Sequence, residues 1–137
     1  MKIGICSSMV FTEKMLEIQR LLQELGHEAF VSIFASAYLG KSETEKEAIT
    51  IYHKNEKDAI REFWNIIKDC DAILVLNFTR RGVENYIGGN SFLEMGFAHV
   101  LHKKIFLMNS IPDVQLYKSE IEAMRPSVIH GDLTKIQ

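Results

Sequence analysis

The chain has 137 residues, of which 47% are hydrophobic and 25% charged, the size and composition of one ordinary globular domain with a real core. Sixteen basic and eighteen acidic residues give a formal net charge of −2. This balance argues against binding to a nucleic-acid polymer, and the lack of a long apolar run argues against a membrane span. We therefore expect one domain over residues 1–137.

Strand and helix patterns alternate along the first half of the chain. A short apolar run at 2–6 predicts a first strand, and Thr12 is predicted to cap a helix with one apolar face. Gly26 is a natural stop for this helix, and the run at 27–34 predicts a second strand. Residues 40–58 are charged and only weakly periodic, which predicts a loop and a solvated helix, either an exposed face or a lid over a pocket.

The alternation continues in the second half. The remaining predicted elements are a helix over 59–67, a strand over 71–78, a helix over 91–102, a strand over 104–109, a helix over 117–124 and a strand over 127–132. The strand at 71–78 is apolar throughout, as expected where helices cover both faces of a sheet. This order predicts a single doubly wound α/β domain, flavodoxin-like or Rossmann-like, with a five-stranded parallel sheet flanked by helices.

Cysteine and histidine spacing gives little support for a metal centre. Cys6 and Cys70 lie far apart and outside any CxxC pattern, each in a predicted core element. We therefore expect free buried thiols and a reducing, cytoplasmic location. His99 and His102 have a spacing that can bind metal, but no third ligand is near, so surface and helix-end roles are favoured. Trp64, on an apolar helical face, is expected in the core.

Two loops have the character of a binding site, since ligands of such sheets lie at the carboxyl ends of the strands. These loop residues are Ser7, Ser8 and Met9 after the first strand, and Gly88, Gly89 and Asn90 before the helix that carries Glu94. Free N–H groups at the helix starts favour an anionic or polyhydroxyl ligand. Neither a GxGxxG nor a P-loop motif is present, and no cofactor is expected. Tyr86 is expected either to stack on a base or to cover the loop.

Glu94 has two competing interpretations. Ser91-Phe-Leu-Glu94 fits the S-x-x-E capping box, in which the carboxylate returns to the backbone at the start of its helix. Alternatively, the helix N-terminus lowers the pKa of Glu94 and keeps the carboxylate ionised for attack on a bound molecule. The two roles compete for the same oxygen atoms, and the residues alone leave both open.

Three segments, KIGICSSM, CDAILVLNF and GGNSFLEMGFAHVLHKKIFLM, resemble in order and spacing the nucleoside 2-deoxyribosyltransferase family, including its 2′-deoxynucleoside 5′-phosphate N-hydrolase branch. The resemblance implies that Glu94 attacks the anomeric carbon of a nucleoside or nucleotide and forms a covalent glycosyl-enzyme, which water or a second base resolves. It further implies that Ser7, Ser8 and Met9 line the sugar and phosphate side, and that Gly88, Gly89 and Asn90 lie close to the sugar. A partner subunit, in a homodimer or larger even homo-oligomer, would bring the region around Met124.

The chain also departs from that family. A family aspartate that helps to protonate the leaving base would fall at Phe63, a second polar site residue at Gly88, and a phosphate-binding arginine at Val10. Arg80 and Arg81, on the loop 78–90, are candidate substitutes for the last of these. The departures motivate an alternative, a nucleoside-binding or nucleotide-binding module that has kept the fold and lost the chemistry.

Overall fold

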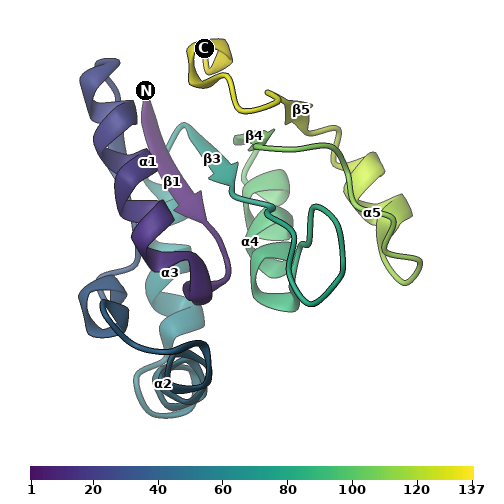
Figure 1. Cartoon of the computed structure of the whole chain (residues 1–137). Helices are drawn as coiled ribbons and strands as arrows, with labels where there is room; N and C mark the ends of the chain where they lie inside the picture. Colours follow the sequence, from purple (N-terminus) through teal and green to yellow (C-terminus); the bar gives the residue numbers. More distant parts are fainter.

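The computed structural model describes all residues 1–137 and contains one sheet of five parallel strands in the order β2-β1-β3-β4-β5 (Figure 1). The strands are β1 Lys2–Cys6, β2 Glu28–Phe30, β3 Ala72–Val75, β4 Lys104–Leu107 and β5 Ser127–Val128. In the register of the central strands, Ile3 of β1 lies opposite Ala29 of β2 and Ala72 of β3. The predicted doubly wound parallel sheet is confirmed, with the flavodoxin-type strand order.

Helices cover both faces of the sheet. One face packs against α1 (Thr12–Glu24) and the C-terminal turn η3 (Leu133–Lys135), and the other against α3 (Ala59–Lys68), α4 (Gly89–Val100) and α5 (Lys118–Ala123). Leu74 of β3 belongs to the first buried cluster, while Ile73 and Val75 belong to the second. Both faces of β3 are therefore shielded from solvent, which explains why its sequence is apolar throughout and does not alternate between apolar and polar residues.

The start of α1 differs from the prediction. A 3-10 turn, η1 (Met9–Phe11), leads into the helix, so Phe11 is the N-cap and makes no side-chain cap. The Thr12 hydroxyl instead donates a hydrogen bond back to the Met9 carbonyl. The end of α1 is as expected, because Gly26 adopts φ +89° and its N–H bonds the carbonyl of Gln23.

The weakly periodic segment after β2 forms a short turn, η2 (Ala35–Tyr38), and one well-defined helix, α2 (Glu43–Glu56). A capping box starts α2, with Ser42 Oγ accepting from the N–H of Glu45 at 3.2 Å and the Glu45 carboxylate accepting from the N–H of Ser42 at 3.0 Å. In Figure 1, α2 lies beyond the carboxyl end of β1, next to α3, and both chain termini lie at the opposite end of the molecule.

Two buried polar side chains attach α2 to the rest of the molecule. Lys46, only 5% exposed, donates from Nζ to the Val10 carbonyl at 3.2 Å and pairs with Glu13. One turn from the other end, the His53 ring stacks on Phe34 with the ring centroids 4.4 Å apart. Burial lowers the pKa of His53, which favours its neutral form. The helix is therefore a fixed part of the fold, with one side turned inward.

β1 has the predicted bounds, but the other four strands are shorter than the segments that predict them, because the chain leaves the sheet before each segment ends. After β3 the side chain of Asn77 donates to the carbonyls of Asn109 and Ser110, each at 3.0 Å. The Asn109 N–H in turn donates to Asn77 Oδ1 at 2.8 Å. These hydrogen bonds connect the segments after β3 and β4 at the carboxyl edge of the sheet.

The remaining sequence predictions have mixed outcomes. Cys6 and Cys70 are buried and unpaired, as expected. Trp64 is not a core residue, since its ring is only partly buried and lies 5.3 Å from the Lys68 ammonium. His99 and His102 are exposed at the C-terminal end of α4. None of the helices is both long and apolar enough to cross a membrane.

Candidate active site

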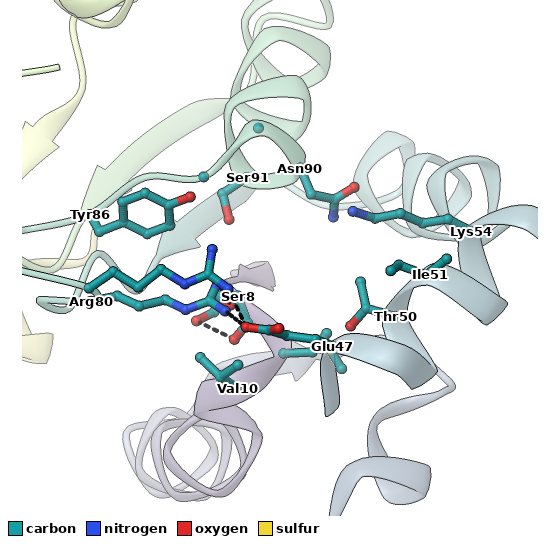
Figure 2. A pocket seen from close by; sticks show the side chains of 15 residues that line it. Ser8, Val10, Glu47, Thr50, Ile51, Lys54, Arg80, Tyr86, Asn90 and Ser91 are labelled. Atoms are coloured by element: carbon teal, nitrogen blue, oxygen red, sulfur yellow. Dashed lines mark hydrogen bonds and ion pairs between the residues drawn. The ribbon is translucent and has the colours of Figure 1, made fainter. Parts of the chain in front are cut away.

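The cleft lies at the carboxyl edge of the sheet between β1 and β3. There the connections that follow these two strands go to opposite faces of the sheet. The chain leaves the carboxyl end of β1 for α1 on one face of the sheet, and leaves the carboxyl end of β3 for α4 on the other face. Ligands of open α/β sheets bind at such switch points. Here a cleft of about 310 Å³ is lined by the loop after β1, the loop after β3, the start of α4 and the inward side of α2 (Figure 2).

All six loop residues singled out in the sequence line this cleft: Ser7, Ser8, Met9, Gly88, Gly89 and Asn90. Ser7 is buried and Ser8 partly buried, directly after the end of β1. Gly89 and Asn90 open α4, so their N–H groups are among those that the helix itself leaves free. The structure thus brings both predicted loops together at one place.

Glu94 lies deeper, in a recess of about 40 Å³ that has room for roughly one water molecule. The recess shares Ser7 and Asn90 with the outer cleft, so the two are adjoining spaces. Glu94 is 6% exposed, and its Oε1 accepts a hydrogen bond of 2.9 Å from Asn90 Nδ2. Its Oε2 is buried and has no hydrogen-bond partner. A single carboxyl oxygen is therefore unsatisfied at the bottom of the site.

The capping interpretation of Glu94 is wrong. The helix begins at Gly89 with Gly88 as the N-cap, and no side chain caps it. Glu94 thus follows the first turn, and its carboxyl accepts from the side chain of Asn90 rather than from the backbone at the helix start. Ser91, the other half of the expected box, is a buried residue inside the helix.

The ionisation state expected for Glu94 is also wrong. Burial raises its pKa to about 8, because the surroundings penalise the charged form. The nearby Cys6 thiol, the charge of Lys54 and the hydrogen bond from Asn90 act in the opposite direction without outweighing burial. The apolar side chains around the recess, which include Ile5, come from elements far away in the sequence. Burial therefore favours the protonated form of this carboxyl near neutral pH in the free protein.

Arg80 is the best-connected cation of the cleft. Its side chain is 12% exposed, and Nη1 donates to Ser8 Oγ at 3.0 Å while Nη2 pairs with Glu47 Oε1 at 2.9 Å. Glu43 adds a longer pair to Nη2 at 3.5 Å, and Arg81 also pairs with Glu47. The Nε atom of Arg80 is buried and has no partner. These contacts link the loop after β3 to α2 across the cleft.

Tyr86 lines the cleft and packs on Gly88, so it covers the loop, which is one of its two expected roles. A Cβ at Gly88 would lie 3.1 Å from Cε1 of the Tyr86 ring, closer than a side chain normally comes. The backbone carbonyl of Ile87, between Tyr86 and Gly88, accepts a hydrogen bond of 2.5 Å from the Tyr117 hydroxyl, and the Tyr117 ring stacks on Phe92. The absence of a side chain at position 88 is what lets Tyr86 pack down on this loop.

α2 forms one wall of the cleft, which agrees with the expectation that residues 40–58 either form an exposed face or cover a pocket, although none of its residues was predicted to line the site. Glu47, Thr50, Ile51 and Lys54 all line the cleft, and Figure 2 shows Lys54 and Asn90 extending toward each other from α2 and α4. Their spacing of three and four residues places them on one side of a helix, a signal that was available in the sequence. No carboxylate pairs with Lys54, and no group of three potential ligands is arranged to hold a metal ion.

No protein-family model and no curated protein matches the chain significantly. Among solved structures, a 2-deoxyribosyltransferase from the psychrotolerant bacterium Bacillus psychrosaccharolyticus is 18% identical, with a TM-score of 0.47 over 78% of this chain and 71% of the other. A CMP N-glycosidase from Clostridium botulinum is also 18% identical, with a TM-score of 0.45 over 78% of this chain and 70% of the other. At these values neither likeness bears on the chemistry of the cleft, which has to follow from the residues of this chain.

Several positions singled out from the family resemblance lie outside the cleft or bring no charge to it. Phe63 is a buried apolar wall of the recess, and Val10 lines the outer cleft as an apolar residue. Glu62, the acidic residue next to Phe63 in the chain, accepts from the Ser32 hydroxyl at 3.3 Å and lines neither space. Met124 packs against the buried cluster under α3, α4 and α5 and does not reach the cleft of its own chain.

Proposed function

We propose that the chain cleaves or transfers the N-glycosidic bond of a nucleoside or nucleotide, with Glu94 as the nucleophile. The observation that carries the proposal is the Glu94 carboxyl, buried below an open cleft with one oxygen held by Asn90 and the other unpartnered. A buried carboxyl oxygen without a hydrogen-bond partner is costly to keep, and such groups concentrate at functional sites. The family resemblance of the segments around Glu94 agrees with this role.

The chemistry needs only one carboxylate oxygen near the anomeric carbon. Oε2 of ionised Glu94 attacks that carbon, and the carbon–nitrogen bond breaks with its electron pair going to the base, which takes up a proton from solvent. The result is a glycosyl ester of Glu94. Water or the nitrogen of a second base then attacks the same carbon, the ester bond breaks, and the carboxylate is regenerated. A carboxylate also stabilises the positive charge that develops on the sugar.

Because the pKa of Glu94 is about 8, the carboxyl has to lose its proton before it can attack. Two features favour this loss when a ligand is present. Sugar hydroxyls that donate to Oε2 stabilise the ionised form, and the ammonium of Lys54 already acts in the same direction. Ligand binding and ionisation of Glu94 are then coupled, so that the nucleophile forms where a substrate is bound.

The other predicted residues have supporting roles in the proposal. Ser7 and Ser8 offer hydroxyls beside the N–H groups at the start of α4, and Met9 forms part of the same wall. Gly88, Gly89 and Asn90 lie closest to the sugar. Met124 takes part only through a partner subunit in a homodimer or larger even homo-oligomer. Light scattering of the purified protein would measure the mass of this assembly.

The test is base release measured by chromatography. Wild-type protein and Glu94→Gln are incubated with deoxynucleosides, ribonucleosides and their 5′-monophosphates, with and without a second free base. We expect the wild type to release or exchange a base, and Glu94→Gln to be slower by about a thousandfold or more, because it lacks the nucleophile. Glu84→Gln, the same change at an exposed loop position, should behave as wild type.

Two results would contradict the proposal. Turnover retained in Glu94→Gln would remove the nucleophile from the mechanism. No turnover by the wild type across the panel, together with a rise in melting temperature on adding a nucleoside or nucleotide, would favour the binding module instead.

A further inference from the structure

We propose that Glu47 is a specificity-determining residue, which neutralises the arginine pair of the cleft and so favours uncharged nucleosides over phosphate monoesters. The inference rests on the proposed function in taking the ligand to be a nucleoside. Its physical basis is independent of the reaction, because the Glu47 carboxylate already pairs with the arginine groups that would bind a phosphate.

The geometry places Glu47 between the two cations. Oε1 of Glu47 lies 2.9 Å from Arg80 Nη2 and also contacts Arg81 Nη2, so one oxygen serves both guanidinium groups. Figure 2 shows Glu47 extending from α2 toward Arg80 and Ser8 across the cleft. Ser8 occupies Nη1 of Arg80, and Glu43 lies 3.5 Å from Nη2. The terminal nitrogens of Arg80 therefore already have partners within the protein.

Without Glu47, the same corner has the properties of a phosphate site. A largely buried guanidinium, the Ser8 hydroxyl and the free N–H groups at the start of α4 line one cleft. This is the combination of donors that binds phosphate oxygens in proteins. The Arg80 Nε, buried without a partner, is a further donor at that place. Glu47 supplies the negative charge that a ligand would otherwise bring.

The pairing of the charges, rather than their sum, indicates which class of ligand the cleft prefers. Arg80 and Arg81 are balanced by Glu47 and Glu43, and only Lys54 is left without a carboxylate partner. A phosphate ester would have to displace Glu47 from both arginines, or bind next to it against the repulsion of like charges a few ångströms apart. A neutral sugar meets neither obstacle, and its hydroxyls can donate to the Glu47 carboxylate.

A charge-only substitution separates this role from a structural one. In Glu47→Gln the side-chain carbonyl can still accept from Arg80, so the link between α2 and the loop is retained while the negative charge is removed. Glu56→Gln makes the same change at an exposed position on the same helix, outside the cleft and without an ion pair. It is the matched control.

The first measurement uses ligands that contain no glycosidic base, so that no turnover is required. Titrations of 2-deoxyribose and 2-deoxyribose 5-phosphate are followed by protein NMR in wild type, Glu47→Gln and Glu56→Gln. We expect Glu47→Gln to bind the phosphate ester at least about tenfold more tightly than wild type, with little change for the neutral sugar. Glu56→Gln should match wild type, and adding Arg80→Gln to Glu47→Gln should abolish the gain.

An equal affinity of wild type and Glu47→Gln for the phosphate ester would overturn the inference, as would the same gain in Glu56→Gln. Glu47→Ala, which favours the helix, replaces Glu47→Gln if that variant does not fold. The second measurement is the ratio of kcat/KM for a deoxynucleoside 5′-monophosphate over its nucleoside, which should also rise about tenfold in Glu47→Gln. If the wild type releases no base, the proposed function fails, and the sugar titrations still decide the role of Glu47.

Discussion

Asn90 donates a hydrogen bond of 2.9 Å to Oε1 of Glu94, which lies four residues further along α4. Residues at this spacing face each other on a helix, so the amide fixes the orientation of the carboxyl. The bond leaves Oε2 as the one oxygen that is available in the recess. Asn90 is therefore a positioning residue for the proposed nucleophile, and it also favours the ionised form.

Replacing Asn90 by alanine should lower kcat/KM for base release by about tenfold to a hundredfold, because Glu94 loses its orientation and one interaction that stabilises its charge. The free energy of unfolding should change by less than about 1 kcal/mol, since the amide lies at the edge of the cleft. Steady-state kinetics measure the change in kcat/KM, and chemical denaturation measures the change in the free energy of unfolding. Leu93→Ala, at an exposed position on the same helix, is the control, and unchanged kinetics in Asn90→Ala would contradict the role.

The pH dependence of catalysis should report Glu94 directly. Only the ionised carboxyl attacks, so kcat/KM should rise with pH and level off above about pH 8, the pKa of Glu94 in the free protein. The corresponding limb of kcat should lie at lower pH, because bound sugar hydroxyls stabilise the carboxylate. Initial rates over pH 5–10 measure both. A kcat/KM profile that falls through this range would instead make Glu94 a general acid.

The same pKa predicts how stability depends on pH. Burial raises the pKa of Glu94 in the native state to about 8 from an ordinary value of 4.5, so the native state binds more protons than the unfolded chain between these values. The free energy of unfolding should therefore fall as pH rises from about 4.5 to 8, by an amount on the order of a few kcal/mol from this group. Glu94→Gln lacks the titration, and its stability relative to wild type should increase over the same range. Denaturant melts of wild type and Glu94→Gln at pH 5 and pH 9 give the two free energies of unfolding. The same change with pH in both proteins would refute the raised pKa of Glu94.

The two glycines before α4 offer a matched pair of substitutions. Gly88→Ala puts a methyl group 3.1 Å from Cε1 of Tyr86 and should displace that ring into the cleft, lowering kcat/KM about tenfold. At Gly89 nothing lies within 4 Å of an added Cβ, so Gly89→Ala should leave the Tyr86 ring in place and gain slightly in stability. Kinetics and thermal melts of both variants test this difference. Equal behaviour of the two would show that the packing of Tyr86 on Gly88 has no effect on the site.

The sheet could be predicted from the sequence because its signal is local. The apolar runs at 2–6 and 71–78 mark the central strands, and the alternation with helices predicts a parallel sheet. The strand order was left open between the flavodoxin-like and Rossmann-like arrangements. The ends of the strands were less predictable. Residues such as Leu76 stay buried after leaving the sheet, so hydrophobicity alone does not show where pairing stops.

The position of the cleft was also predictable, since both loops follow from the topology, but its chemistry was not. The contact of Arg80 with Glu47 joins residues 33 positions apart, and nothing local to either residue specifies it. The elevated pKa of Glu94 has the same origin, because the side chains that desolvate it come from β1, α1 and α3. A helix start predicts an ionised carboxylate, and tertiary packing reverses that prediction.

The buried Lys46 fixes how the cleft responds to a ligand. Its ammonium links α2 to the Val10 carbonyl at 3.2 Å, and His53 attaches the other end of the helix to Phe34. Because α2 is held at both ends, it has little conformational freedom to lose when a ligand binds. The entropy cost of ordering this wall of the cleft therefore arises during folding and not on binding. We therefore expect the heat capacity change on association to reflect the apolar area of the ligand itself, with little added by reorganisation of the protein.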